Sequence, residues 1–504
     1  MRDQTNFFLF LGVYSIVTFL LFHLVYNTSK QVIDEEFHLR QGEHYCRGRF
    51  HIWDEKITTF PGLYLISGSF LSPFKACSVY FLRLTSAVAS IANAYLVYII
   101  RKAVIPRRSD AYLLLESISL ATLPPLYFFS HLYYTDVLSV TMVLMMVYFS
   151  VREMHNWGAL AGFLAILMRQ TNVVWVGFVY GSQLVNMTMS VCLAERQAKQ
   201  KPQSKFGFMD LIPTITTLLE RPALILNVLR DAHSKFLGYE LNLAGFVGFL
   251  WYNGSIVVGD KTAHVAAVHL PQIFYFSLFF AAFSSSHVLG TFRRVVRFAL
   301  KRWYVSCFCV GLFLCVIQLN TIVHPYLLAD NRHYTFYIWM RFYQRWTFAK
   351  FLPVPIYYGI LVLLGLILFT RGQGGQTVGF SLLWILATLA SVALQQLIEV
   401  RYFILPFLVL RLLQTNVQSS TKLLALEVLA NVLINAATFY IFCTKAVYWS
   451  SRSTKKGRIK YRTSMSCCKA TDASVANIQS KLKPTVWPPW PRVNRINPSS
   501  TKIP

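Results

Sequence analysis

The chain has 504 residues, of which 55% are hydrophobic and 14% charged, and its mean hydropathy is +0.46. A soluble globular protein is typically about 45–50% apolar and about 25% charged, so the composition excludes that class and indicates a polytopic membrane protein. The formal net charge of +27 does not indicate nucleic-acid binding. The basic residues fall in short segments between apolar runs, the pattern that orients membrane proteins toward the cytoplasm.

The first apolar run, Phe7–Tyr26, predicts an uncleaved signal-anchor and the first membrane helix. It is longer than the apolar region of about 7–15 residues in a signal peptide, and no small-residue cleavage site follows it. Further apolar segments lie at residues 76–100, 113–130, 136–151, 158–188, 237–258, 266–290, 303–323, 354–370, 378–398, 402–415 and 422–446.

Segment 158–188 is interrupted by the polar residues 169–172, and its length allows two short spans. Counted by length, the segments predict an all-α polytopic protein with roughly 12–14 transmembrane helices. We expect residues 1–450 to form this membrane domain. The basic segment 451–504 lacks the periodicity of a packed element and is predicted to be a disordered tail.

Orientation follows from the basic segments, because such segments stay in the cytoplasm. Residues 101–108 and 293–302 are predicted to be cytoplasmic loops, and so are residues 195–235 if segment 158–188 crosses the membrane twice. When the spans are counted from these cytoplasmic loops, three polar loops fall together on the opposite side, at residues 27–60, 253–270 and 324–350. The nine cysteines show no paired spacing and no metal-binding CxxC pattern. Three of them, Cys307, Cys309 and Cys315, lie in an apolar run, and we interpret these three as small buried side chains.

The first polar loop carries the acidic cluster Asp34-Glu35-Glu36, followed by His38. In a helix, Asp34 and His38 lie on one face. Three adjacent carboxylates beside a low-dielectric boundary cannot all ionise easily, so at least one pKa should rise toward that of a useful base. The alternative interpretation is a solvated acidic patch next to the membrane.

The third polar loop carries His324, Asp330, Asn331, Arg332 and His333 among several tyrosines. Aromatic residues are ordinary at a membrane interface, but that does not explain four successive polar residues, Asp-Asn-Arg-His. Arg332 and His333 are candidates to neutralise a phosphate, since arginine makes charge-assisted hydrogen bonds to phosphate oxygens.

Two arginines, Arg169 and Arg401, fall within or at the ends of predicted spans, where charge usually faces a cavity or a partner. Arg169 has no carboxylate near it in sequence, which favours a functional role. Glu399 can pair with Arg401, and in that alternative interpretation Arg401 has only a structural role. Lys261 in the second polar loop is a weaker candidate for the same cavity. No glycine-rich phosphate loop is present, so a phosphate substrate would arrive on a lipid.

At these residues the chain resembles a known family. DEEFHLRQGEHYC, WDEKITTFPGLYLIS, MRQTNVVW, NGSIVVGDKTAH, HPYLLADNRHYTFYIW and VRYFILPF occur in this order. They are similar to motifs of the dolichyl-phosphate-glucose α-1,2-glucosyltransferases, which add the third, terminal glucose to the lipid-linked oligosaccharide of asparagine-linked glycosylation. The resemblance covers about residues 7–445 and not the basic tail.

The resemblance implies a GT-C type, inverting glucosyltransferase of the endoplasmic reticulum membrane whose active site faces the lumen. Its substrates would be dolichyl-phosphate-glucose and the diglucosylated oligosaccharide on dolichyl pyrophosphate, with no cofactor and no obligatory metal. In the family an acidic residue of the first loop is the base. Asp34 matches that position, Glu35 is the second candidate, and His38 would orient the base. Glu36 departs from the family's usual aliphatic residue, so the choice between the carboxylates stays open.

Two other classes of function remain as alternatives. Interrupted helices and intramembrane arginines also occur in secondary transporters, although the sequence shows no second copy of MRQTN or DEEFH. A non-catalytic membrane scaffold whose basic tail binds anionic lipid is the other alternative.

Overall fold

The computed structural model describes residues 2–29, 34–196, 208–261, 267–323, 338–346, 348–369, 376–415 and 419–444. Within these ranges the chain is helical and contains no β-strand, which confirms the all-α prediction. The predicted tail 451–504 lies outside the described residues. The longer helices are α1 (Arg2–Thr28), α2 (Glu35–Cys46), α3 (Gly62–Leu71), α4 (Val79–Val104), α5 (Asp110–Ala121), α6 (Pro124–Phe129), α7 (Thr135–Val151), α8 (His155–Met168), α9 (Val173–Arg196), α10 (Leu211–Glu220), α11 (Ala223–Asn253), α12 (Pro271–Phe283), α13 (Ser285–Lys301), α14 (Trp303–Asn320), α17 (Val354–Phe369), α18 (Val378–Val392), α19 (Ile404–Leu413) and α20 (Thr421–Thr444). Short single-turn elements are η1 (Ser72–Phe74), η2 (Gln170–Asn172), η3 (Phe208–Asp210), η4 (Trp339–Tyr343), η5 (Ala349–Phe351) and η6 (Val400–Phe403).

Among the described residues, six helical segments are long and apolar enough to cross a membrane, or eight if each of two bent helix pairs is one span. This confirms a polytopic membrane protein. The length criterion accepts fewer spans than the 12–14 predicted, because several predicted segments fold as shorter helices. Segment 113–130 divides into α5 and α6 before Pro124, and segment 402–415 folds as η6 and the ten-residue α19.

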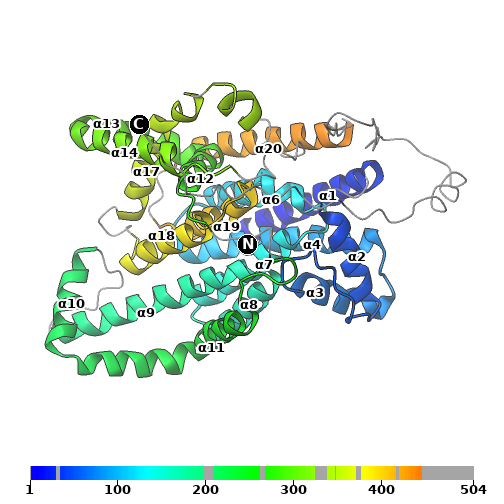
Figure 1. Ribbon diagram of the computed structural model, residues 1–504, viewed down its shortest axis with the longest axis horizontal. Helices are drawn as coiled ribbons and strands as arrows, with labels where there is room; N and C mark the ends of the chain where they lie inside the picture. The colour runs from blue at the N-terminus through cyan, green and yellow to red at the C-terminus, as the bar shows by residue number, and fades with distance from the viewer. Residues whose placement is uncertain are drawn as a thin grey trace, which may run out of the picture. The chain divides into compact units, whose positions relative to one another are not determined.

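Helix α7 lies in the middle of the largest hydrophobic core and packs against both α4 and α8 (Figure 1). Its apolar residues are buried around most of its circumference, as expected for a helix that is hydrophobic on every face. The first turn of α7, with Thr135 and Asp136, is also buried. α2 and α3 pack against each other beside α4, so the first polar loop is placed close to this turn.

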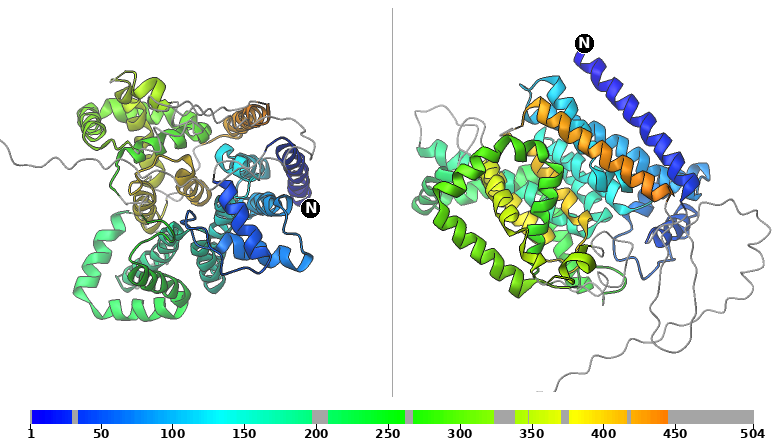
Figure 2. Two further views of the ribbon diagram at one scale, coloured as in Figure 1. Left: turned by 45° about the vertical axis from the view of Figure 1, so that its right-hand side comes forward. Right: turned by 90° about the horizontal axis from the view of Figure 1, so that it is seen from above.

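The first and last described helices are neighbours. α1 and α20 run side by side (Figure 2) and contact each other. A cluster of aromatic side chains joins them through α6, with Tyr14 on α1 and Phe439 on α20 both contacting Tyr127. Helices from both ends of the region of resemblance therefore pack against each other.

Two segments that the sequence predicts as basic loops are largely helical. Residues 195–235 contain the end of α9, all of α10 and the start of α11, and α10 meets α11 at 109°. Residues 293–302 form the second half of α13, which meets α12 at 108°. Hydropathy alone does not reveal these helices, because cations that repeat every three or four residues also fit one exposed face of a helix. The cytoplasmic side of these segments stays a prediction.

Candidate active site

A buried ion pair fixes the start of α2. The Glu35 carboxylate is fully buried and accepts hydrogen bonds from Arg83 Nε and Nη2, both at 2.7 Å, and from the Tyr133 backbone N–H at 2.8 Å. The Glu35 backbone N–H donates to the Tyr134 hydroxyl at 3.1 Å. These bonds tie α2 to α4 and to the connection before α7. Glu35 is therefore placed to position the helix, with its oxygens occupied by protein donors.

The three adjacent carboxylates lie in three different environments, because successive residues of a helix point about 100° apart. Glu35 faces the core, whereas Glu36 pairs with Arg40 on the surface. Asp34 is the exposed N-cap residue of α2. Burial and the nearby Asp34 charge raise the pKa of the Tyr134 hydroxyl above its ordinary value, which places Asp34 close to that ring.

His38 belongs to α2 in the first polar loop and lies near Arg169 and Arg401. Its Nδ1 and the Tyr64 hydroxyl form a hydrogen bond of 2.5 Å, and its ring meets the Tyr134 ring edge-on at 5.4 Å. Burial, and then the positive charge of Arg401, lower the pKa of His38 to about 4. His38 is consequently a neutral imidazole at physiological pH, and it can orient a neighbour without adding charge.

Arg169 and Arg401 meet at one carboxylate. Arg169 forms an ion pair with Asp136 Oδ1, and Arg401 Nη1 lies 3.3 Å from Asp136 Oδ2. Arg401 also binds Glu399 through Nη2 at 2.6 Å and Nε at 3.0 Å, which confirms the pairing predicted as the structural alternative. Arg169 has no carboxylate near it in sequence, and its partner Asp136 lies 33 residues away.

Asp136, Arg169 and Arg401 line a small cavity of about 40 Å³ that is partly open to the surface. This space is large enough for one or two water molecules, so a ligand as large as a sugar phosphate would have to extend beyond it. Aromatic rings surround the two cations: the guanidinium of Arg401 lies 5.7 Å from the Tyr134 ring centre, and that of Arg169 lies 5.9 Å from Tyr402. The remaining lining is polar and apolar and comes from Ser139, Val140, Thr171, Asn172, Trp175, Ser391, Gln395, Ile404 and Leu405.

The break after α8 presents Arg169 to this cavity. Arg169 has an extended backbone, and the short η2 follows it before α9 begins. Asn172 Nδ2 donates to Ser139 Oγ and to the Ala165 carbonyl, both at 2.7 Å, which closes the end of α8. Gln170 Nε2 donates to the Thr58 carbonyl at 2.6 Å. The MRQTN segment thus contacts α7 and the first polar loop at once.

Gly62 lets α3 approach the end of α8 closely. A Cβ at this position would meet the Leu167 carbonyl and would lie 2.8 Å from the Met168 backbone nitrogen. A side chain larger than that of glycine cannot be accommodated without moving one helix. The glycine of the TTFPGLYL motif therefore brings the first loop onto the residues that precede Arg169.

The second polar loop also reaches the first. The Asp260 N–H donates to the Glu55 carbonyl at 2.9 Å, and the Val258 N–H donates to the Thr58 carbonyl at 3.3 Å. Gly259 has φ of +70° and lies against the carbonyls of Glu55 and Ile57. Lys261 does not line the cavity. Its Nζ is exposed and binds the Asn253 carbonyl at 2.6 Å, at the end of α11.

The candidates His324, Asp330, Asn331, Arg332 and His333 lie outside the described residues. Their proposed role in phosphate binding stays a prediction. In the part of the chain that the structure describes, no group of three or more His, Cys, Asp and Glu side chains could hold a metal ion.

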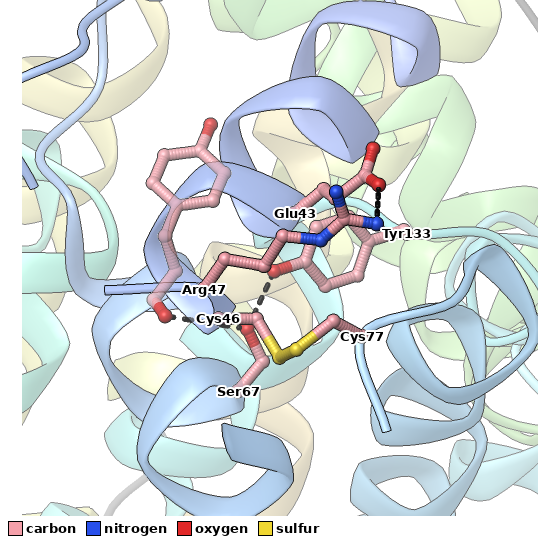
Figure 3. The surroundings of a disulfide bond; sticks show 7 residues. Glu43, Cys46, Arg47, Ser67, Cys77 and Tyr133 are labelled. Atoms are coloured by element: carbon pink, nitrogen blue, oxygen red, sulfur yellow. Dashed lines mark hydrogen bonds and ion pairs between the residues drawn. A yellow bond between two sulfur atoms is a disulfide. The ribbon is translucent and has the colours of Figure 1, made fainter. Parts of the chain in front are cut away.

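A disulfide that the sequence reading did not predict joins Cys46 at the end of α2 to Cys77 before α4, with a Cα–Cα distance of 5.7 Å (Figure 3). Next to it, the hydroxyls of Ser67 and Tyr133 lie 2.5 Å apart, so α3 is bound to the connection before α7. The expectation that no cysteines pair was wrong because the two lie 31 residues apart and become neighbours only when α3 folds back along α2.

Sequence reasoning also missed Asp136 and Tyr134. Asp136 stands at the start of an apolar run, in TDVLSV. A carboxylate at membrane depth is costly unless it is paired, so the rule that singled out Arg169 could have identified its partner. Nothing in the sequence distinguishes Tyr134 from the other tyrosines at membrane ends.

The chain is similar to characterised proteins over most of its length. It is 40% identical to the Dol-P-Glc:Glc(2)Man(9)GlcNAc(2)-PP-Dol alpha-1,2-glucosyltransferase of Drosophila melanogaster, over 86% of this chain and 94% of the relative. Proteins of the same name from Rattus norvegicus and Homo sapiens are 35% and 33% identical, again over 86% of this chain and over 95% and 94% of the relatives. No solved structure matches the chain. Residues 28–412 match the DIE2/ALG10 family, and with these relatives the match shows that the chain belongs to that family.

Proposed function

We propose that this protein transfers glucose from dolichyl-phosphate-glucose, in α-1,2 linkage, to the Glc2Man9GlcNAc2 oligosaccharide on dolichyl pyrophosphate. The observation that carries the proposal is the similarity of nearly the whole chain to glucosyltransferases named for that reaction. The site agrees with it, because Arg169 and Arg401 line one cavity and Asp34 is exposed at the start of α2. A GT-C architecture fits the helical membrane fold.

The proposed location is the endoplasmic reticulum membrane, with the site facing the lumen. The Cys46–Cys77 disulfide supports this side for the first polar loop, since disulfides form and persist in oxidising compartments such as this lumen. The positive charge of the segments predicted to be cytoplasmic supports the same orientation.

In the proposed mechanism Asp34 is the general base and the arginine cluster receives the donor phosphate. The acceptor 2-hydroxyl attacks the anomeric carbon of glucose and passes its proton to the Asp34 carboxylate as the new C–O bond forms. The bond from the anomeric carbon to the phosphate oxygen breaks, and its electron pair leaves with dolichyl phosphate. Attack opposite the leaving group inverts the configuration from β to α.

Arg169 and Arg401 would stabilise the negative charge on the leaving phosphate. The Tyr134 ring lies between the start of α2 and the Arg401 guanidinium, so base and cations come from different elements that flank one space. Arg332 and His333, with Asp330, Asn331 and His324, are proposed to complete the donor site. Cationic side chains suffice for a single phosphate, so no metal or cofactor enters the proposal.

The reaction is tested in cells that lack the endogenous terminal glucosyltransferase and therefore accumulate the diglucosylated lipid-linked oligosaccharide. Expression of this chain should restore the triglucosylated form. Unchanged accumulation, with the protein present in the membrane, would contradict the proposed reaction.

The site is tested by Asp34→Asn and Glu35→Gln in the same transfer assay. Removal of a general base should lower the rate by about 10²–10⁴-fold for Asp34→Asn, with an unchanged unfolding temperature. Glu35→Gln should lower the unfolding temperature, because it breaks the buried pair with Arg83. Near-normal turnover by Asp34→Asn would exclude Asp34 as the base and leave the reaction itself untouched.

A further inference from the structure

Helix α13 presents two parallel rows of exposed side chains that the glucosyltransferase site does not use. Apolar Phe292, Val296 and Leu300 repeat every four residues, and each is followed directly by a cation, at Arg293, Arg297 and Lys301. These six residues line one shallow hollow. Phe292 and Leu300 are 59% and 71% exposed.

The helix has three faces around its axis. His287 and Thr291 are buried on the face that packs against α17 and α20. The exposed apolar row extends this packed face to one side, and the basic row lies beyond it. No ion pair forms with Arg293, Arg297 or Lys301 within the described part of the chain, and residues 285–302 contain no carboxylate.

The neighbouring helices place α13 at a membrane surface. α12 is apolar along its length and meets α13 at 108°, so the two cannot both follow the membrane normal. Immediately after α13, α14 is long and apolar enough to span, and only 6% of that stretch is buried in the protein. A helix with a cationic row cannot lie in the hydrocarbon core, whereas a basic amphipathic helix lies in the interface.

We infer that α13 is an interfacial helix that binds an anionic phospholipid. The acyl chains would lie along Phe292, Val296 and Leu300, and the phosphate group would sit beside Arg293, Arg297 and Lys301. We infer an anionic lipid because the helix presents an apolar row and a cationic row side by side. A soluble anion needs only the cations, and a neutral lipid needs only the apolar row.

The test uses the full-length protein in detergent micelles that contain phosphatidylserine or phosphatidylcholine, with bound lipid counted by native mass spectrometry. Each cation near the surface contributes about fivefold in affinity, so Arg293→Gln/Arg297→Gln/Lys301→Gln should weaken phosphatidylserine binding by about 100-fold. A matched variant, Arg107→Gln/Arg230→Gln/Lys422→Gln, removes the same charge from exposed positions elsewhere and should bind as the wild type does.

Phe292→Ser/Leu300→Ser supplies a second arm that leaves every cation in place. It should also weaken phosphatidylserine binding, whereas binding of glycerophosphoserine, which lacks acyl chains, should be undetectable in all proteins. The inference is overturned if both triple variants lose binding equally, if phosphatidylcholine binds as tightly as phosphatidylserine, or if glycerophosphoserine binds as tightly as the lipid. Unfolding temperatures confirm that each variant is folded, and all the substituted positions are exposed.

Discussion

At the scale of single residues, Asp136 determines how positive charge is arranged in the candidate site. Its side chain is 4% exposed and contacts both Arg169 and Arg401. Two guanidinium groups repel each other in a partly desolvated space unless an anion lies between them. Asp136 provides that anion before any substrate binds, so the arginines are already oriented when a phosphate enters the cavity.

We predict that Asp136→Asn destabilises the protein more than Glu399→Gln does. Breaking a buried ion pair costs about 3–5 kcal/mol, and Asp136 bridges two arginines, whereas Glu399 contacts Arg401 at a more exposed position, 13% against 4%. The unfolding temperature of the purified protein measures this. Added dolichyl phosphate should raise the unfolding temperature of Asp136→Asn more than that of the wild type, because its phosphate replaces the missing anion. Equal unfolding temperatures for the two variants would count against the bridging role.

His38 gives a prediction about pH. Its folded-state pKa of about 4 lies below the ordinary value of 6.5, so the unfolded chain binds a proton there that the folded chain does not. Below about pH 6.5 this difference favours unfolding, and the loss of stability grows until the pH falls to about 4. The stability of the wild type relative to His38→Gln should therefore decrease between pH 6.5 and 4. Thermal unfolding at several pH values measures it, and the exposed His51→Gln serves as control. A constant difference would contradict the burial of a neutral imidazole.

Among the site residues, the sequence identified those whose charge is unusual for the segment in which they lie. Arg169 and Arg401 stand out because charge is rare in apolar runs, and the structure brings both to one cavity. The division of roles among Asp34, Glu35 and Glu36 could not be predicted, because it depends on Arg83, which lies 48 residues from Glu35 in sequence. By composition the three carboxylates are equivalent, whereas in the helix each side chain points into different surroundings.

At the scale of elements, the first polar loop contains α2, which packs against α3 directly after the loop. The disulfide, the Glu35–Arg83 pair and the close approach at Gly62 attach it to α4, to the α6–α7 connection and to α8. Hydropathy predicted a polar segment between two spans and could not predict its internal helices. Helices α10 and α13 were missed for a related reason, since mixed polar and apolar residues resemble a loop when only hydropathy is averaged.

Gly62→Ala should impair the site, and Gly68→Ala in the same helix should not. A Cβ at Gly62 would lie 2.8 Å from the Met168 backbone nitrogen, whereas at Gly68 the nearest atom is 3.5 Å away, an ordinary contact. Relieving the clash moves α3 away from the residues preceding Arg169, so we expect at least a tenfold loss of transfer activity and a lower unfolding temperature. Assays of both variants in parallel check this. Equal behaviour would show that the approach of α3 to α8 is not required.

Removal of the disulfide should lower stability without abolishing the fold. Cys46 and Cys77 close a loop of 31 residues in sequence separation, for which the chain-entropy relation gives about 3–4 kcal/mol. Cys46→Ser/Cys77→Ser should unfold at a lower temperature, and a reducing agent should have the same effect on the wild type but none on the variant. Cys307→Ser/Cys315→Ser, at two exposed free cysteines, is the control. If reduction leaves the wild-type unfolding temperature unchanged, the bond does not stabilise the domain.

At the scale of the whole molecule, two groups of buried charge lie near opposite ends of α4. Arg83 in its first half binds Glu35. Arg101 near its end binds Glu116, and Arg101 Nη1 donates to the carbonyls of Leu412 and Gln414 at 2.8 and 2.9 Å, which satisfies the last carbonyls of α19. A single helix is thereby connected to the first polar loop at one end and to the C-terminal helices at the other.

The group near Arg101 also contains Arg411 on α19 and Glu427 on α20, whose side chains lie 3.1 Å apart. Glu427 accepts from Ser119 Oγ on α5 and from the Ser286 N–H at the start of α13, at 2.6 and 3.0 Å. The two arginines and two glutamates balance in charge, and all four are fully or almost fully buried. Their contacts join five helices from three separate parts of the sequence, which hydropathy alone could not have placed together.

We therefore predict strong coupling between Arg411 and Glu427. Arg411→Met leaves buried Glu427 without its cation, which costs about 3–5 kcal/mol, whereas Glu427→Gln leaves Arg411 only the more distant Glu116, at 3.7 Å, and should cost less. The double variant removes both charges, so its loss should be smaller than the sum of the single losses by about 1–3 kcal/mol. The unfolding temperatures of the wild type, the two single variants and the double variant, measured in one detergent, give the double-mutant cycle. Arg230→Gln is an exposed control. Additive losses would mean that the two side chains stabilise separate contacts and are not coupled.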